Sequence, residues 1–158
     1  MNSVNIAVKE YITRALSLLM QKKPYSKITI SELTEKAGVC RNSFYRNFDS
    51  LEDVVIQSFG KEFKTIFTDR NSVIFESLEF WEKVVELRSR LITLYDAKQS
   101  HLFYDGIYAL VFADAPRKKG EDRFPLVHEI GAMYGVVDEW LKEGAVLDAS
   151  ALLERYKN

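Results

Sequence analysis

The amino-acid sequence predicts an all-α fold in which short helices near the N-terminus precede longer ones. Apolar residues recur at three- and four-residue spacing along most of the chain, which is the spacing of one helix face. The only alternating stretch that could form a strand is residues 27–31, and a helix-capping pattern explains those residues better. Cap and stop signals then divide the periodic segments into separate helices.

Composition favours a compact intracellular protein. The chain has 158 residues, of which 47% are hydrophobic and 28% charged, enough for one or two small domains with a core. Its single cysteine cannot form an internal disulfide, which suits a reducing cytoplasm. No apolar run approaches the roughly 18 to 20 residues of a membrane span, and the N-terminus lacks a secretory signal. We therefore expect a cytoplasmic protein without membrane contacts.

Charge is unevenly distributed along the chain. The net charge is −1, but residues 1–50 contain 8 Lys and Arg against 4 Asp and Glu, whereas residues 51–158 contain 14 against 19. A basic N-terminal third attached to an acidic remainder predicts that the first part contacts a polyanion.

The first two helices are defined by their boundaries. Residues 3–22 form an amphipathic pattern that stops before Pro24. Thr29 and Glu32 then form a capping box, in which the Thr29 hydroxyl accepts from a free amide and Glu32 reaches back to the Thr29 amide. Gly38 ends this second helix, because glycine readily adopts the left-handed conformation of a C-cap.

The next helix begins at Val39 or Cys40 and extends to Phe48 in the sequence prediction. Phe44 and Phe48 are four residues apart and face inward together, while polar residues occupy the other faces. Two short helices that meet at a glycine turn behind a longer helix make a helix-turn-helix pattern.

The remainder of the chain predicts further helices. Asp49 and Ser50 begin the next one, and Gly144 ends a late one. The predicted helices cover about residues 50–68, 73–97 with an interruption near 88–90, 100–113, 124–143 and 148–156, with breaks at 69–72 and 115–122.

Residues 28–55 resemble the TetR/AcrR family of bacterial transcriptional regulators. The resemblance rests on the Thr29-capped helix, on Ala-Gly-Val at residues 37–39, and on Tyr45 followed three residues later by Phe48. Late in the chain, GAMYGVVDEWLKEG at residues 131–144 is similar to the glycine-containing late helix of one group of members.

That resemblance implies an all-α homodimer with two domains. Residues 1–49 would be a three-helix DNA-binding domain, linked through the helix at about 50–68, and residues 50–158 would be a helical regulatory and dimerisation domain. Two positions depart from the family pattern: the third helix opens with CRNS rather than Ser-Lys-Gly-Thr, and Leu51 replaces a lysine that contacts phosphate in other members.

The expected function is sequence-specific transcriptional regulation, as a ligand-responsive repressor that binds a palindromic operator. The expected partners are double-stranded DNA, a second copy of the chain and a small-molecule effector. The rival hypothesis is a protein-interaction adaptor or coactivator on the same fold that does not read DNA alone. No phosphate loop or nucleophile motif predicts an enzyme, and no cofactor is expected.

DNA contacts are expected at the start of the second helix and along the third. Arginine can bind a guanine edge, asparagine can read adenine, and a tyrosine hydroxyl can donate to phosphate. A helix N-terminus also presents amides to phosphate. The predicted DNA-binding residues are Lys27, Thr29, Arg41, Asn42, Ser43, Tyr45 and Arg46.

Three further predictions concern the rest of the chain. An aromatic set in the middle helices is either plain core or the lining of an effector pocket: Phe75, Trp81, Tyr95, Phe103, Tyr104 and Tyr108. The dimer seam is predicted at Val136, Val137, Trp140, Leu141 and Leu152. No metal site is expected, because the two histidines lack ligand spacing, and Cys40 is either a redox-sensitive thiol or a small residue in place of serine.

Overall fold

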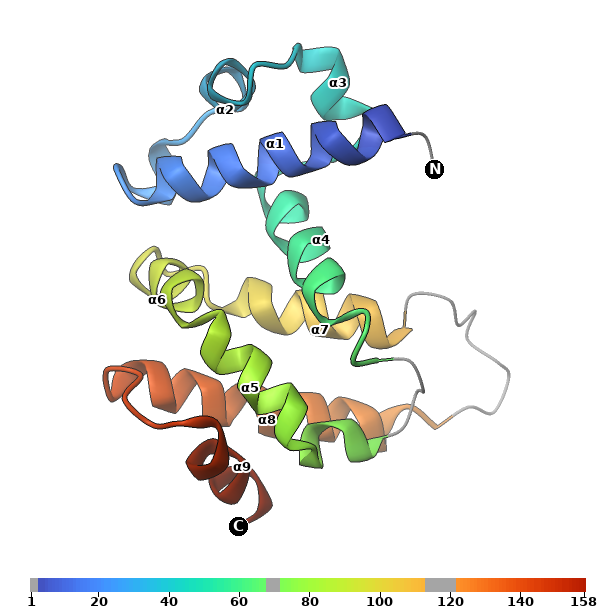
Figure 1. Cartoon of the computed structure of the whole chain (residues 1–158), viewed down its shortest axis with the longest axis vertical. Helices are drawn as coiled ribbons and strands as arrows, with labels where there is room; N and C mark the ends of the chain where they lie inside the picture. Colours follow the sequence, from blue (N-terminus) through green and yellow to red (C-terminus); the bar gives the residue numbers. More distant parts are fainter. Residues whose placement is uncertain (1–2, 68–71, 113–121) are drawn as a thin grey trace.

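The computed structural model describes residues 3–67, 72–112 and 122–158, and the regular structure in these ranges is entirely helical. We call residues 3–48 the head, and residues 72–112 and 122–158 the body. Figure 1 shows the two parts at opposite ends of the molecule, with the helix at residues 51–63 between them. The elements are α1 (Ser3–Met20), η1 (Tyr25–Lys27), α2 (Ile30–Ala37), α3 (Arg41–Tyr45), α4 (Leu51–Phe63), η2 (Ser72–Glu76), α5 (Leu78–Glu86), α6 (Arg88–Asp96), α7 (His101–Phe112), α8 (Phe124–Lys142) and α9 (Ala149–Lys157).

The all-α prediction is confirmed, and most helix boundaries fall within two residues of those expected. The segment predicted at 73–97 forms three pieces, η2, α5 and α6. The break between α5 and α6 at Leu87 lies beside the interruption predicted near 88–90, whereas the separation of η2 from α5 was not predicted. α4 is shorter than expected and ends at Phe63. The predicted breaks at 69–72 and 115–122 lie almost wholly outside the described residues. None of the described helices is long and apolar enough to cross a membrane.

The head buries apolar residues from each of its three helices. Ile12 and Leu16 of α1, Leu33 of α2, and Phe44 and Phe48 around α3 are each at most 3% exposed. Figure 1 shows α2 and α3 on the side of α1 that faces away from the body. The head therefore exposes one surface of α2 and α3 at the far end of the molecule.

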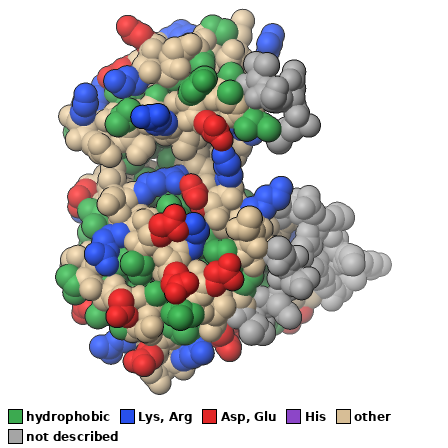
Figure 2. Space-filling view, in the orientation of Figure 1, with side chains coloured by type: hydrophobic (Ala, Val, Ile, Leu, Met, Phe, Trp, Pro, Cys, Tyr) green, Lys and Arg blue, Asp and Glu red, His purple; other side chains and the backbone are tan. Residues whose placement is uncertain are grey.

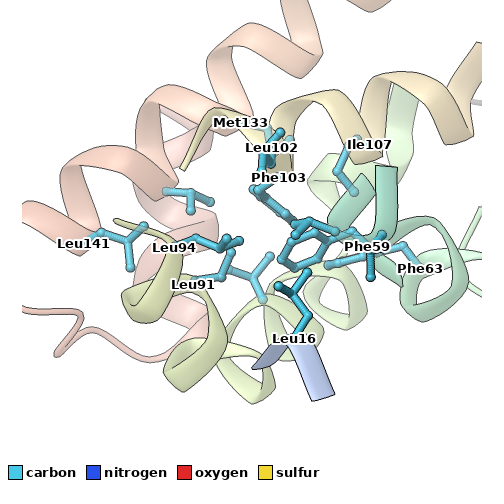
Figure 3. Close-up of a cluster of buried hydrophobic side chains, with 14 of the residues drawn as sticks. Leu16, Phe59, Phe63, Leu91, Leu94, Leu102, Phe103, Ile107, Met133 and Leu141 are labelled. Atoms are coloured by element: carbon cyan, nitrogen blue, oxygen red, sulfur yellow. The ribbon is translucent and has the colours of Figure 1, made fainter. Parts of the chain in front are cut away.

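Helix α4 packs on both parts of the molecule. Its Val54 and Val55 are buried near α1, whereas Phe59 and Phe63 enter the body. The Phe103 ring of α7 lies 5.1 Å from the Phe59 ring and 5.8 Å from the Phe63 ring, between centroids. Figure 3 shows these rings meeting leucines of α1, α6 and α7 in one cluster. Because one apolar core continues from the head through α4 into the body, a domain boundary at residue 49 stays a prediction.

The crossing of α4 and α7 is unusually close at Gly106. A Cβ atom at this position would lie 2.9 Å from the Phe59 Cβ and 3.1 Å from the Ile56 carbonyl oxygen. Real Cβ atoms do not approach a neighbouring helix so closely, so the two helices could not keep this spacing around a larger residue. Glycine at 106 thus sets the distance between α4 and α7.

We expect Gly106→Ala to destabilise the protein by about 1 to 3 kcal/mol, because the added methyl group forces two buried helices apart. Gly60→Ala on α4 is the matched control, since its added Cβ would meet nothing within 4 Å. That control should be neutral or stabilise by up to about 1 kcal/mol through helix propensity. Urea denaturation of both variants measures the difference. Equal stability of the two variants would contradict this account of the crossing.

Candidate nucleic-acid interface

The start of α2 is fixed by the cap that the sequence predicts. The Thr29 hydroxyl accepts a hydrogen bond from the Glu32 amide at 3.3 Å, and Thr29 itself is in extended geometry. The Glu32 carboxylate does not complete the box on Thr29, because it pairs with Lys23 at 2.5 Å. Gly38 ends α2 with φ +68°, as expected for a left-handed cap.

Helix α3 is shorter than the predicted helix and comprises Arg41–Tyr45. The chain after it tightens into a turn: the Asn47 amide donates to the Phe44 carbonyl at 2.9 Å, and the Asn47 side chain donates to the Ser43 carbonyl at 2.8 Å. Gln57 of α4 holds the same turn by donating to the Asn47 carbonyl at 3.2 Å. These bonds end the helix and direct the chain into α4.

The two faces of α3 differ sharply in burial. Phe44 is 0% exposed and Phe48 is 3% exposed, which confirms their predicted role in the core. Tyr45 is 58% exposed and lies edge-on to Phe44, with ring centroids 5.3 Å apart. One aromatic residue of the pair therefore anchors the helix while its neighbour extends from it.

Most of the predicted DNA-binding side chains are exposed in the structure. Ser43 is half-buried, and the others point outward on or beside α2 and α3: Lys27, Thr29, Arg41, Asn42, Tyr45 and Arg46. No ion pair in the described part of the chain engages Lys27, Arg41 or Arg46. Their charges are thus not neutralised by carboxylates of the head.

A residue that was not predicted from the sequence also contributes to this surface. The Arg41 guanidinium donates to the hydroxyl of Ser31, an exposed residue in the first turn of α2. This contact joins the beginnings of α2 and α3 and restricts the position of Arg41. Sequence alone offered no signal for it, since the two residues are ten apart and on different helices.

Cys40 lies at the edge of the same surface. Its thiol is exposed and its sulfur lies 3.2 Å from the Ser43 hydroxyl oxygen. Hydrogen bonding to Ser43 lowers the pKa of the Cys40 thiol below its ordinary value. Cys40 is the N-cap residue of α3, but its side chain accepts no hydrogen bond from a main-chain amide of the helix.

Five of the six predicted effector-pocket residues belong to one continuous apolar core or pack against it, and Tyr108 is exposed. Phe75 and Trp81 are buried together, with the indole N–H donating to the Phe75 carbonyl at 2.7 Å. Phe103 instead packs on α4, whereas Tyr104 and Tyr108 stack with ring centroids 6.0 Å apart. Tyr95 is half-buried on α6. A single effector pocket lined by all six residues stays a prediction.

Four of the five predicted seam residues are buried inside the chain itself: Val137, Trp140, Leu141 and Leu152 are at most 6% exposed. Only Val136 is partly accessible. The outward face of α8 beside it presents the small residues Gly131, Ala132 and Gly135. The four buried residues therefore pack beneath the outward face of α8. Among the described residues, no group of three or more His, Cys, Asp or Glu could hold a metal ion.

Comparison with known proteins finds a family that matches most of the head and the start of α4. Residues 12–57 match the family described as bacterial regulatory proteins, tetR family. One relative is the HTH-type dhaKLM operon transcriptional activator DhaS of Lactococcus lactis subsp. lactis (strain IL1403). It is 24% identical over 106 residues, which cover 67% of this chain and 51% of the relative. The chain thus aligns with about half of that protein. The family match spans the helix-turn-helix and the first half of α4.

The cap at Thr29 generates a stability prediction. Thr29→Ala should destabilise the protein by about 1 kcal/mol, because the Glu32 amide at the start of α2 loses its acceptor. Thr29→Ser retains a hydroxyl at the same place and should recover most of that loss. Thermal unfolding of the two variants compares them directly. Equal destabilisation by serine and alanine would show that the hydroxyl is not what stabilises α2.

Proposed function

We propose that this chain, whose residues 12–57 match the tetR family of bacterial regulatory proteins, regulates transcription by inserting α3 into the major groove of an operator. The observation that carries the proposal is the division of α3: Phe44 and Phe48 anchor it, and Arg41, Asn42 and Tyr45 extend outward. We propose further that the protein works in the cytoplasm and without a catalytic step.

Each exposed side chain suits a different part of the duplex. Arg41 stands at the first turn of α3, the part of a recognition helix that reaches base edges, and a guanidinium can bind guanine with two hydrogen bonds. Tyr45 and Arg46 lie one turn later and suit the phosphate backbone, which fixes the register of the protein. Lys27 and Thr29 lie before α2 and suit a neighbouring phosphate.

The lysine that contacts phosphate in similar regulators has no counterpart at the start of α4. Leu51 occupies that position, is half-buried and packs against the apolar core. A contact with the DNA phosphate at this position would have to come from a main-chain amide rather than from a charged side chain. We propose that binding depends correspondingly more on α3 and on the residues before α2.

We propose that the protein acts as a homodimer on a near-palindromic operator. Two copies of α3 would then occupy half-sites about 34 to 36 Å apart, one turn of the duplex. The small residues on the outward face of α8 support this arrangement, because they permit close approach of a partner helix. The contact residues of such a seam would be Gly131, Ala132, Gly135 and Val136.

The direction of regulation is proposed as repression that is relieved when an effector binds the body. Such an effector would act by binding one orientation of the two heads more tightly than another. Activation is the second candidate, because DhaS is named a transcriptional activator. A reporter assay with the adjacent promoter separates the two: deletion of the regulator raises expression in the first case and lowers it in the second.

The DNA-binding proposal is tested with Arg41→Ala and Tyr45→Phe, which leave the buried face of α3 intact. Arg41→Ala should lose about 1 to 3 kcal/mol of binding to the operator and relax its sequence preference. Tyr45→Phe removes only the hydroxyl and should weaken binding by about 1 kcal/mol, equally on all sequences. Fluorescence anisotropy with DNA from the adjacent intergenic region measures both, at several salt concentrations.

Lys157→Ala is the control for that experiment, since it removes an exposed cation at the end of α9. It should bind DNA like the parent protein. If the parent binds no intergenic DNA with sequence preference, the function proposed here is wrong. If the parent binds and both α3 variants match it, the function stands and the assignment of the contact residues is wrong.

The dimer proposal is tested with Gly135→Arg. A Cβ at Gly135 would meet nothing within 4 Å in the single chain, so a long side chain can be placed there without disturbing the fold. It should block the approach of a partner helix and convert the dimer to monomer in sedimentation equilibrium. Ser89→Arg, on the exposed surface of α6, is the matched control and should leave the dimer intact. A dimer that persists in Gly135→Arg would place the seam elsewhere.

A further inference from the structure

A second candidate site lies in a cleft between the head and the body. The cleft has a volume of about 700 Å³ and is lined by residues of α1, by the second half of α4 and by Arg90 of α6. Figure 2 shows the molecule hollowed between its two parts, with Lys and Arg side chains beside the hollow. This volume falls within the range of about 300 to 1,000 Å³ that small-molecule sites occupy.

The cleft carries an excess of positive charge. Five basic side chains line it: Lys9, Arg14, Lys61, Lys64 and Arg90. Two carboxylates oppose them, because Glu10 accepts from Lys61 at 2.7 Å and Glu62 lies 3.6 Å from Arg90. The other three cations have no carboxylate partner among the described ion pairs. Of these, Lys9 donates to the neutral amide oxygen of Gln57 at 2.6 Å and lies 5.4 Å from the centre of the Phe48 ring. The lining therefore has a net charge of +3.

Apolar side chains accompany these charges. Ile6 is 44% exposed and Leu18 is 37% exposed, both on the α1 wall of the cleft, and Phe48 contributes to the same lining. Leu18 lies one helical turn from Arg14, so this part of the lining is apolar beside a cation without a carboxylate partner, whereas Ile6 lies about 18 Å away along α1. A ligand that is apolar at one end and anionic at the other would match both the leucine and the arginine.

Arg90 is the most constrained of the cations. Its side chain is 23% exposed, it donates to the Ser58 hydroxyl, and its guanidinium carbon lies 4.5 Å from the centre of the Phe59 ring. Burial lowers the pKa of the Arg90 guanidinium, and the Glu62 charge opposes that effect. The contacts with α4 hold this guanidinium in one place, as a preorganised anion site requires.

We propose that this cleft binds a small organic anion, with its carboxylate or phosphate among Arg14, Lys64 and Arg90 and its apolar portion against Leu18. The site lies on the side of α1 that faces the body, whereas α2 and α3 lie on the other side (Figure 1). Ligand and nucleic acid would therefore occupy different surfaces of the head. The binding itself does not depend on the proposed function in transcription.

The test uses the full chain and three probes with the same alkyl tail: octanoate, octyl phosphate and octanol. Isothermal titration calorimetry should show saturable binding of at least one anion and roughly tenfold weaker binding of octanol, which lacks the charge. The stronger anion identifies the acidic group that the cleft prefers. The double variant Arg14→Glu/Lys64→Glu should weaken anion binding by roughly tenfold or more, since it reverses two charges of the lining.

Lys22→Glu/Lys36→Glu is the matched control, because it makes the same change in net charge at exposed residues of the head that do not line the cleft. It should bind the anions like the parent protein. Equal weakening in both double variants would reduce the effect to overall charge and overturn the site. Equal affinity for octanol and the anions would overturn the anion preference, and the absence of saturable binding by every probe would overturn the proposal altogether.

Discussion

The close contact between α4 and α7 is the constraint on which the rest of the structure depends. α4 joins the two parts of the molecule, and its apolar residues lie in one core that continues from beneath α1 into the body. Gly106 permits a separation at which Phe59 and Phe63 reach Phe103. The orientation of the head on the body thus follows from the packing of one helix rather than from an extensive interface between α1 and the body.

Few residues hold α3 in place. α3 has five residues, too short to be stable alone, so it depends on tertiary contacts. Phe44 and Phe48 supply burial, while Asn47 and Gln57 bind the turn that follows. The Ser31 hydroxyl adds a polar contact from α2 to Arg41. These contacts place the polar side chains before any ligand is present, which lowers the entropic cost of binding.

The sequence predicted most of the fold because local signals mark its boundaries. Thr29, Gly38, Ser50 and Gly144 act through their own backbone and near neighbours, so their effect is legible without tertiary information. The outward face of α3 was predictable for the same reason. In contrast, the contact of Arg41 with Ser31 and the cleft around Arg90 join distant segments. Burial of Trp140 and Leu141 was also missed, because helical periodicity distinguishes faces but not which neighbour covers each face.

The crossing at Gly106 also determines how the head can move relative to the body. The packing of Phe59 and Phe63 on Phe103 fixes the angle between α4 and α7, and α4 extends from this crossing toward α3 with about 1.5 Å of length per residue. A change in the angle of this crossing would therefore move the head relative to the body. Even a rotation of α4 that leaves the aromatic packing at this crossing intact would produce a larger displacement at α3, which lies farther from the crossing. In a dimer, a slight tilt of α4 in each copy would change the separation of the two α3 helices, so that they would no longer match the pitch of the duplex.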